Sequence, residues 1–128
     1  MELLREFCFN SKSPMTNDSF NWSKTYTEQI LNTLYAGRGF VLIDEKQTGI
    51  LVAAKFQSFW RQDKIQLQEI MLHSNNKFVI VRLIKEYIKI AKEMLNKNEI
   101  QQAIMASYED LGFERFGMVK LEHHWEIK

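Results

Sequence analysis

The chain has 128 residues, of which 45% are hydrophobic and 26% are charged, a composition typical of an ordinary soluble globular domain. This length fits one domain over residues 1–128, and the composition excludes a disordered tail or a fibrous protein. Seventeen Lys and Arg against sixteen Asp and Glu give a formal net charge of +1. The overall charge therefore favours neither nucleic acid nor a membrane surface as a partner.

The single cysteine, Cys8, excludes an internal disulfide and a cysteine-rich zinc site. Residues 1–6 lack a basic segment followed by a long apolar stretch, which predicts that there is no signal peptide. The longest apolar runs are only a few residues, such as 78–81, whereas a membrane-spanning helix needs ~20. We therefore expect a soluble protein that is made and used in the cytoplasm, or packaged from it.

The first third of the sequence predicts a strand, a polar loop and a helix. Residues 3–9 form a short, mostly apolar run typical of a strand, and the loop after it contains the single proline. A helix over about 21–35 follows, because apolar residues recur there at helical spacing. Asp18 or Ser19 is its expected N-cap, and the Gly-Arg-Gly sequence at 37–39 ends it.

Three consecutive strands are predicted next, over residues 40–44, 50–60 and 65–73, with short polar turns between them. Strands joined in this way form an antiparallel meander. Because a helix separates the first predicted strand from the meander, the sheet needs a crossover connection and some parallel pairing. The sequence therefore predicts an α/β fold with a mixed, mostly antiparallel, twisted sheet flanked by helices.

The clearest predicted element is a long helix over residues 78–95, in which an apolar stripe alternates with a charged face. Ser74 or Asn75 is its expected N-cap. Residues 99–111 fit either a strand or a helix. Residues 113–127 are predicted to form one or two closing strands.

Glu69 is the strongest candidate for chemistry. Period-two alternation places it in an apolar row with Leu67 and Met71 on one face of the strand. Burial without a cation would raise the pKa of this carboxyl toward neutrality, which suits a general base that deprotonates an amine. The alternative is a surface carboxylate, or one paired with Arg61 or Lys64.

Two other groups of residues, a histidine pair and an aromatic cluster, are considered as functional sites. His123 and His124 are adjacent, and adjacent side chains on a strand point to opposite faces, so no metal site is expected. Phe56, Phe59 and Trp60 cluster where the second meander strand meets its turn. These rings either cover the core or dock a partner.

Three sequence patterns, in this order, resemble the GNAT (Gcn5-related N-acetyltransferase) family. The first is the hairpin over 40–54, in which Gly49 opens a strand, as in the family. The second is Gln-Glu-Ile-Met-Leu-His at 68–73, which leads directly into the long helix, and the third is Tyr-Glu-Asp-Leu-Gly-Phe at 108–113. The resemblance covers roughly residues 38–120 and implies a GNAT-like fold in a single small domain.

The resemblance also implies a site for acetyl-CoA and roles for two side chains. Glu69 would be the catalytic base, and Tyr108 would protonate the departing thiolate; the alternative for Tyr108 is an aromatic side chain that covers the core. The coenzyme would be bound where the strand at 65–73 meets the long helix, by Leu72, His73, Asn75, Asn76, Lys77, Phe78 and Val79.

Two departures from the family pattern predict a degenerate coenzyme site. The family has glycines before the long helix, which let backbone amides close on the pyrophosphate of the coenzyme. Asn76, Phe78 and Ile80 stand there in this chain, and their side chains are expected to keep a phosphate away. Residues 98–107 are too few for both a mean strand of ~5–6 residues and a mean helix of ~11, so the fifth strand of the family is expected to be lost or shortened.

These departures predict a GNAT-like protein that no longer acetylates efficiently and serves in interaction or virion assembly. Its small size, its Asn- and Lys-rich composition and its eroded motifs resemble phage-encoded members of the family. The expected partner is then a protein, such as a phage structural protein, and neither a membrane nor nucleic acid. The alternative is an active acetyl-CoA-dependent N-acetyltransferase that transfers an acetyl group to an amine, and a third possibility is a small-molecule sensor with a vestigial site.

Overall fold

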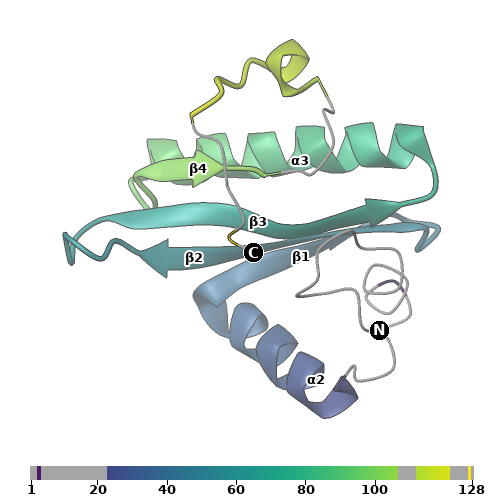
Figure 1. Cartoon of the computed structure of the whole chain (residues 1–128), viewed down its shortest axis with the longest axis horizontal. Coiled ribbons are helices and arrows are strands. Elements are labelled where there is room, and N and C mark those ends of the chain that lie inside the picture. Colours follow the sequence, from purple (N-terminus) through teal and green to yellow (C-terminus); the bar gives the residue numbers. More distant parts are fainter. Residues whose placement is uncertain (1–2, 4–22, 107–111, 122–126, 128) are drawn as a thin grey trace.

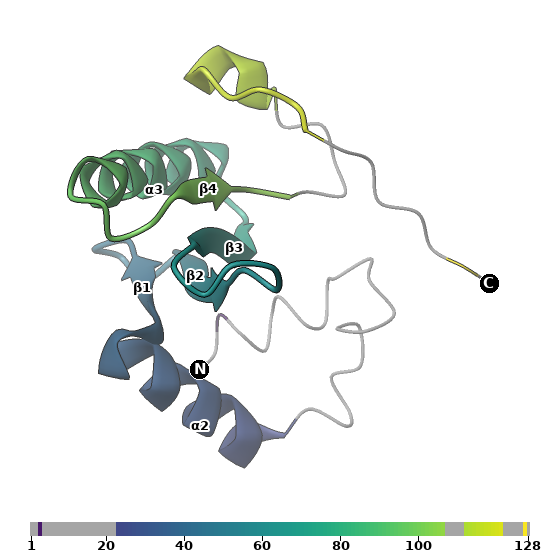
Figure 2. The ribbon, with the colours of Figure 1, turned by 90° about the vertical axis from the view of Figure 1, so that its left-hand side faces the viewer.

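The structure is a computed structural model that describes residues 3, 23–106, 112–121 and 127. Four strands form one sheet in the order β1-β2-β3-β4. Helix α3 covers one face of this sheet and helix α2 lies on the opposite face (Figures 1 and 2). The described elements, in chain order, are α2 (Lys24–Thr33), the π-helical turn η1 (Leu34–Arg38), β1 (Gly39–Ile43), β2 (Gly49–Gln57), β3 (Ile65–Ser74), α3 (Lys77–Asn96), β4 (Gln102–Ile104) and the 3₁₀ turn η2 (Phe113–Phe116).

The expected mixed sheet is confirmed. β1 pairs with β2 and β2 with β3 in antiparallel fashion, whereas β4 pairs with β3 in parallel fashion. The parallel pair is reached through α3, as a crossover requires. Among the described residues, no helix combines the length and the apolar character that a membrane crossing would need.

The second strand of the meander is shorter than predicted. β2 ends at Gln57, so residues 58–60 belong to the turn and not to the strand. There the Ser58 hydroxyl accepts hydrogen bonds from the backbone N–H groups of Trp60 and Arg61, both at 3.2 Å. This local bonding satisfies backbone groups that a longer strand would have placed in the ladder.

β3 contains a β-bulge at Ile70. Glu69 and Met71 are paired with adjacent residues of β2, which leaves Ile70 between them without a partner in the register. A bulge reverses the alternation of side chains beyond it. Accordingly Leu67 lies in the core cluster under α3, whereas Met71 lies in the cluster on the α2 side. The predicted single row that joins Leu67, Glu69 and Met71 is therefore wrong for Met71.

The long helix is confirmed, with α3 spanning Lys77–Asn96. Its N-cap is Asn76, whose side-chain Oδ1 accepts the Phe78 N–H at 2.9 Å, so the predicted caps Ser74 and Asn75 are wrong. Ser74 instead donates its hydroxyl to the Thr48 carbonyl oxygen at 2.9 Å. The apolar stripe of α3 packs on the sheet, and its buried residues are Val79, Leu83, Ile84, Tyr87, Ala91 and Met94.

Helix α2 begins later than predicted. Its N-cap is Ser23, whose hydroxyl accepts the Tyr26 N–H at 3.2 Å, and not Asp18 or Ser19, which lie outside the described residues. Although α2 is described throughout, no residue of it is buried. Its half-buried Leu31 packs against the cluster on this face of the sheet, which includes Leu34 of η1 at 4% exposed. Gly37, with φ of 105°, takes a backbone conformation that favours glycine, and β1 starts two residues later.

The remaining predicted strands have mixed outcomes. Of residues 3–9 only Leu3 is described, and it is helical and not extended. The ambiguous stretch at 99–111 contains the strand β4, three residues long, which agrees with a shortened fifth strand. The closing strands predicted over 113–127 are wrong for residues 113–121, which form η2 and a segment without strand pairing; residues 122–126 lie outside the described part.

Candidate functional site

Glu69 lies at the centre of the candidate site, on β3 directly before the bulge. Its side chain is 6% exposed, and its Oε1 accepts the Ala106 N–H at 3.1 Å. Burial raises the pKa of Glu69 to about 6, against the smaller lowering effect of the Ala106 hydrogen bond. The predicted burial and raised pKa are thus confirmed. Neither cation proposed as an alternative partner contributes to the pKa of Glu69: Arg61 pairs with Asp63 in the turn at 3.1 Å, and Lys64 lines a separate hollow.

The carboxylate of Glu69 stands where β3 and β4 stop pairing. The parallel register ends with Gln68 opposite Ile104, and the next residue of β3 is Glu69. Beyond this point β3 and the segment after β4 are joined by a hydrogen bond from the Ala106 backbone N–H to the Glu69 side chain. β-Bulges are over-represented next to active sites, and ionisable groups with shifted pKa values cluster at functional sites; Glu69 has both features.

Tyr87 of α3 reaches the same point from above the sheet. It is 2% exposed, and its hydroxyl lies 2.7 Å from the Ile104 carbonyl oxygen and 3.4 Å from the Leu67 carbonyl oxygen. Burial raises the pKa of Tyr87, and the negative charge of Glu69 adds to this, so the hydroxyl keeps its proton and donates it. Helical spacing predicts Tyr87 only as part of an apolar stripe. A further signal is that a buried tyrosine hydroxyl needs a hydrogen-bond acceptor.

The predicted coenzyme residues lie together where β3 ends and α3 begins. Leu72 and His73 are paired with Leu51 and Ile50 of β2. Asn75 and Asn76 connect β3 to α3, and residues 77–79 belong to the first turn of that helix. This first turn contains no acidic residue. The N-terminus of α3 and the carboxyl end of β3 lie on the same side of the molecule (Figure 1). The structure therefore brings these residues to one end of the sheet, where β3 stops and α3 begins.

The side chains at this helix entrance take different directions. Phe78 is 80% exposed, so its ring does not pack into the core. Val79 is 7% exposed and lies against Gly49, where a Cβ would overlap it. A helix N-terminus and a lysine attract an anion, but the Asn76 side chain already accepts the Phe78 N–H. The expectation that side chains keep a phosphate away from this entrance stays a prediction.

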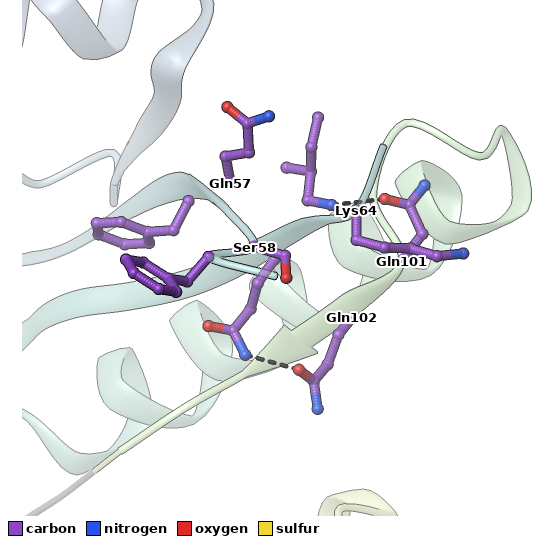
Figure 3. Close-up of a pocket in the computed structure, with 9 residues that line it drawn as sticks. Gln57, Ser58, Lys64, Gln101 and Gln102 are labelled. Carbon is purple, nitrogen blue, oxygen red and sulfur yellow. Dashed lines mark hydrogen bonds between the residues drawn. The ribbon is translucent and has the colours of Figure 1, made fainter. Parts of the chain in front are cut away.

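A separate hollow of about 600 Å³ lies at the opposite end of β3, beside the turn after β2 and the start of β4 (Figure 3). Its polar groups are mostly amides. Gln66 donates to the Gln102 Oε1 at 2.6 Å, and the Ile65 N–H donates to the Gln101 Oε1 at 2.6 Å. Glu69 is not part of the lining, whose one charged group is Lys64. The hollow therefore lacks a carboxylate that could take part in proton transfer, and sequence reasoning did not anticipate it.

Tyr108, His123 and His124 lie outside the described residues, so the predicted role of Tyr108 stays a prediction. Within the described ranges, no group of three or more His, Cys, Asp or Glu side chains could hold a metal ion.

The sequence matches no protein family model and no curated protein, but the structure is similar to solved acetyltransferases. An acetyltransferase of Trypanosoma brucei matches with a TM-score of 0.64 at 15% identity, covering 99% of this chain and 88% of the other. An aminoglycoside acetyltransferase from an uncultured soil metagenomic sample, in complex with trehalose, has a TM-score of 0.64 at 16% identity, covering 99% and 86%. Glucosamine-6-phosphate N-acetyltransferase from Arabidopsis thaliana has 0.62 at 13%, covering 99% and 86%.

The fold is GNAT-like. The similarity extends over nearly the whole chain at low sequence identity.

Proposed function

We propose that this protein is an acetyl-CoA-dependent N-acetyltransferase that transfers an acetyl group to an amine. The observation that supports this most is Glu69: a carboxyl group that is 6% exposed, with a pKa of about 6, at the point where β3 and β4 of a GNAT-like sheet separate. A general base is most effective when its pKa lies near the working pH.

Glu69 acts as the base in this proposal. At pH 7 the Glu69 carboxyl is ionised in most molecules, because its pKa is about 6. The Ala106 N–H holds Oε1, so Oε2 is the oxygen that accepts the proton lost by the amine nitrogen as the nitrogen attacks. The buried surroundings raise the basicity of this oxygen above that of an exposed glutamate. Tyr108 is the proposed acid for the departing thiolate.

The coenzyme would be held at the end of the sheet formed by Leu72, His73 and residues 75–79. Acetyl-CoA, when bound, supplies the acetyl group. The first-turn amides of α3 and the Lys77 ammonium would bind its diphosphate, since a helix N-terminus attracts anions. For the Phe78 amide to contribute, the Asn76 side chain would have to release the Phe78 N–H that it accepts at 2.9 Å.

A second candidate function, a non-catalytic role in interaction or assembly, has one observation in its favour. Phe59 and Trp60 at the tip of the β2–β3 hairpin are 89% and 86% exposed, and their ring centroids lie 4.9 Å apart at 80°. The turn that presents them is fixed by the Ser58 hydrogen bonds. Exposed aromatic side chains on a fixed turn are typical anchors at protein interfaces.

Release of the coenzyme thiol from acetyl-CoA, measured with a panel of primary amines, tests the main proposal. The panel includes amino sugars, aminoglycosides, polyamines and peptide N-termini, since two of the similar structures are described as acting on an aminoglycoside or on glucosamine-6-phosphate. Glu69→Gln is expected to lower kcat by about 10²–10⁴-fold, the usual contribution of a general base. The affinity for acetyl-CoA should stay unchanged.

Glu86→Gln is the matched control, because Glu86 lies on the exposed face of α3 and loses the same charge. This variant should keep wild-type activity. If no amine releases the thiol, and millimolar acetyl-CoA does not raise the melting temperature, the enzymatic proposal is wrong and the interaction role is preferred.

A further inference from the structure

We propose that Tyr87 is a positioning residue for Glu69: its hydroxyl fixes β4 at Ile104 and thereby holds the Ala106 N–H against the Glu69 carboxylate. The inference deepens the proposed function, on which it rests for the role of Glu69 as a base.

The hydroxyl of Tyr87 is not needed for packing. The ring lies in the core cluster under α3 and contacts Phe40 with ring centroids 6.2 Å apart, a contact that a phenylalanine would also make. The hydroxyl adds a buried polar group, which is costly unless it is hydrogen-bonded. Its bond to the Ile104 carbonyl oxygen, at 2.7 Å, meets this need and is the specific consequence of having tyrosine there.

The hydroxyl lies at the end of the β3–β4 ladder. Ile104 is the last residue of β4 and is paired with Gln68, while the second carbonyl near the hydroxyl belongs to Leu67 of β3. One side chain from α3 therefore contacts both strands at the point where their own pairing stops. It fixes the position from which the chain after β4 leaves the sheet.

Ala106 follows Ile104 by two residues, a reach of at most about 7 Å of extended chain. Fixing Ile104 therefore restricts where the Ala106 N–H can lie. That N–H donates to Glu69 Oε1 at 3.1 Å, and Glu69 is the residue next to Gln68. The Tyr87 hydroxyl and the Glu69 carboxylate thus hold the same segment, one through a carbonyl and the other through an amide.

Few other groups act on Glu69. Burial and the Ala106 N–H account for its pKa, and among the described residues of β2, β3, β4 and α3 no charged side chain contributes to it. Tyr87 is the titratable group that is electrostatically linked to Glu69. A change in the position of Ala106 should therefore be visible directly in the ionisation of Glu69.

The test is Tyr87→Phe, with the Glu69 carboxyl followed by ¹³C NMR as a function of pH in the full chain without coenzyme. Because the Ala106 hydrogen bond lowers the pKa of Glu69, its weakening should move that pKa above the wild-type value of about 6. The Ala106 amide should also exchange with solvent up to roughly tenfold faster, as expected when a hydrogen bond that contributes about 1 kcal/mol is weakened.

Two controls separate positioning from general destabilisation. Tyr35→Phe removes a hydroxyl from a side chain that is 67% exposed, and it should change neither readout. Leu83→Ala removes buried side-chain volume from the same helix and should lower stability without moving the pKa of Glu69. The proposal is overturned if Tyr87→Phe leaves both readouts at wild-type values, or if Leu83→Ala shifts the pKa equally.

A second variant, Ala106→Pro, keeps the proposal testable if Tyr87→Phe does not fold. It removes the N–H donor outside the core, and it should raise the pKa of Glu69 as Tyr87→Phe does; an unchanged pKa contradicts the proposed link. None of these measurements uses acetyl-CoA or turnover. Failure of the acetyltransferase proposal and failure of the positioning proposal are therefore distinguishable.

Discussion

The two helices on opposite faces of the sheet differ in how much they bury. Both were predicted from apolar residues at helical spacing, yet α3 buries six residues against the sheet whereas α2, described throughout, buries none. Tyr87, which is 2% exposed, belongs to the core cluster on the α3 side, and Glu69, which is 6% exposed, shares a face of β3 with Leu67 of that cluster. Helical spacing thus predicts that a helix forms. It does not predict how much of the helix is buried against the sheet.

The largest expected effect is the loss of stability when the α3 face is truncated. Leu83→Ala should lower the free energy of unfolding by about 2–5 kcal/mol, the usual cost of this change in a core, because Leu83 is 5% exposed. Ile30→Ala in α2 should cost less than about 1 kcal/mol, because Ile30 is 38% exposed. Urea unfolding measures both, and equal losses would remove the distinction between the two faces.

A smaller effect is expected from crowding the contact between β2 and α3. A Cβ at Gly49 would overlap Val79 and come within 3.0 Å of the Ser74 Cβ and 3.2 Å of the Leu83 Cδ1. Gly49→Ala should therefore cost about 1–3 kcal/mol of stability, as overpacking does. Combining it with Val79→Ala should cost less than the sum of the two single changes. An additive pair would show that this contact is looser than the structure indicates.

The charge of Glu69 should reduce stability at neutral pH. Because its folded pKa is raised from 4.5 to about 6, its stabilising contribution is present below pH 4.5 and is lost as pH rises through about 6. Glu69→Gln abolishes this loss, so above pH 6 it should be more stable than wild type by an amount on the order of 2 kcal/mol. Denaturation across this pH range measures the difference, and Glu86→Gln should show no such pH-dependent gain. A Glu69→Gln variant that is less stable at pH 7 would contradict the burial of an ionised carboxylate.

The smallest effect is expected at the hairpin tip. Replacing Phe59 and Trp60 together with serine should change the free energy of unfolding by no more than about 0.5 kcal/mol, because both side chains are almost fully exposed. The pKa of Glu69 should also stay the same. A loss of several kcal/mol would mean that the rings cover the core and do not present a surface.

Much of the fold could be predicted because its signals are local. The meander and the long helix follow from periodicity within each segment, and the burial of Glu69 follows from its apolar neighbours in β3. The cap of α3 was misassigned because Ser74, Asn75 and Asn76 are all capable caps, and only the tertiary contact of Ser74 with Thr48 removes one of them. β4, at three residues, is too short to show a pattern.

The parts of the site that could not be predicted depend on contacts between distant residues. The acceptor of the Tyr87 hydroxyl is 17 residues away in sequence, and the donor to Glu69 is 37 residues away. The bulge did leave a trace, since Ile70, Met71 and Leu72 are apolar in succession and break the alternation that precedes them. Nothing in that run specifies which residue loses its partner.

The most direct test of the account is a titration of the ¹⁵N-labelled protein with acetyl-CoA, followed through its backbone amides. Binding where β3 stops and α3 begins should shift the amides of Phe78 and Ala106, and should leave those of Phe59 and Trp60 at the hairpin tip unchanged. Amides that stay unmoved at millimolar acetyl-CoA, or shifts confined to the hairpin tip, would contradict a coenzyme site beside Glu69.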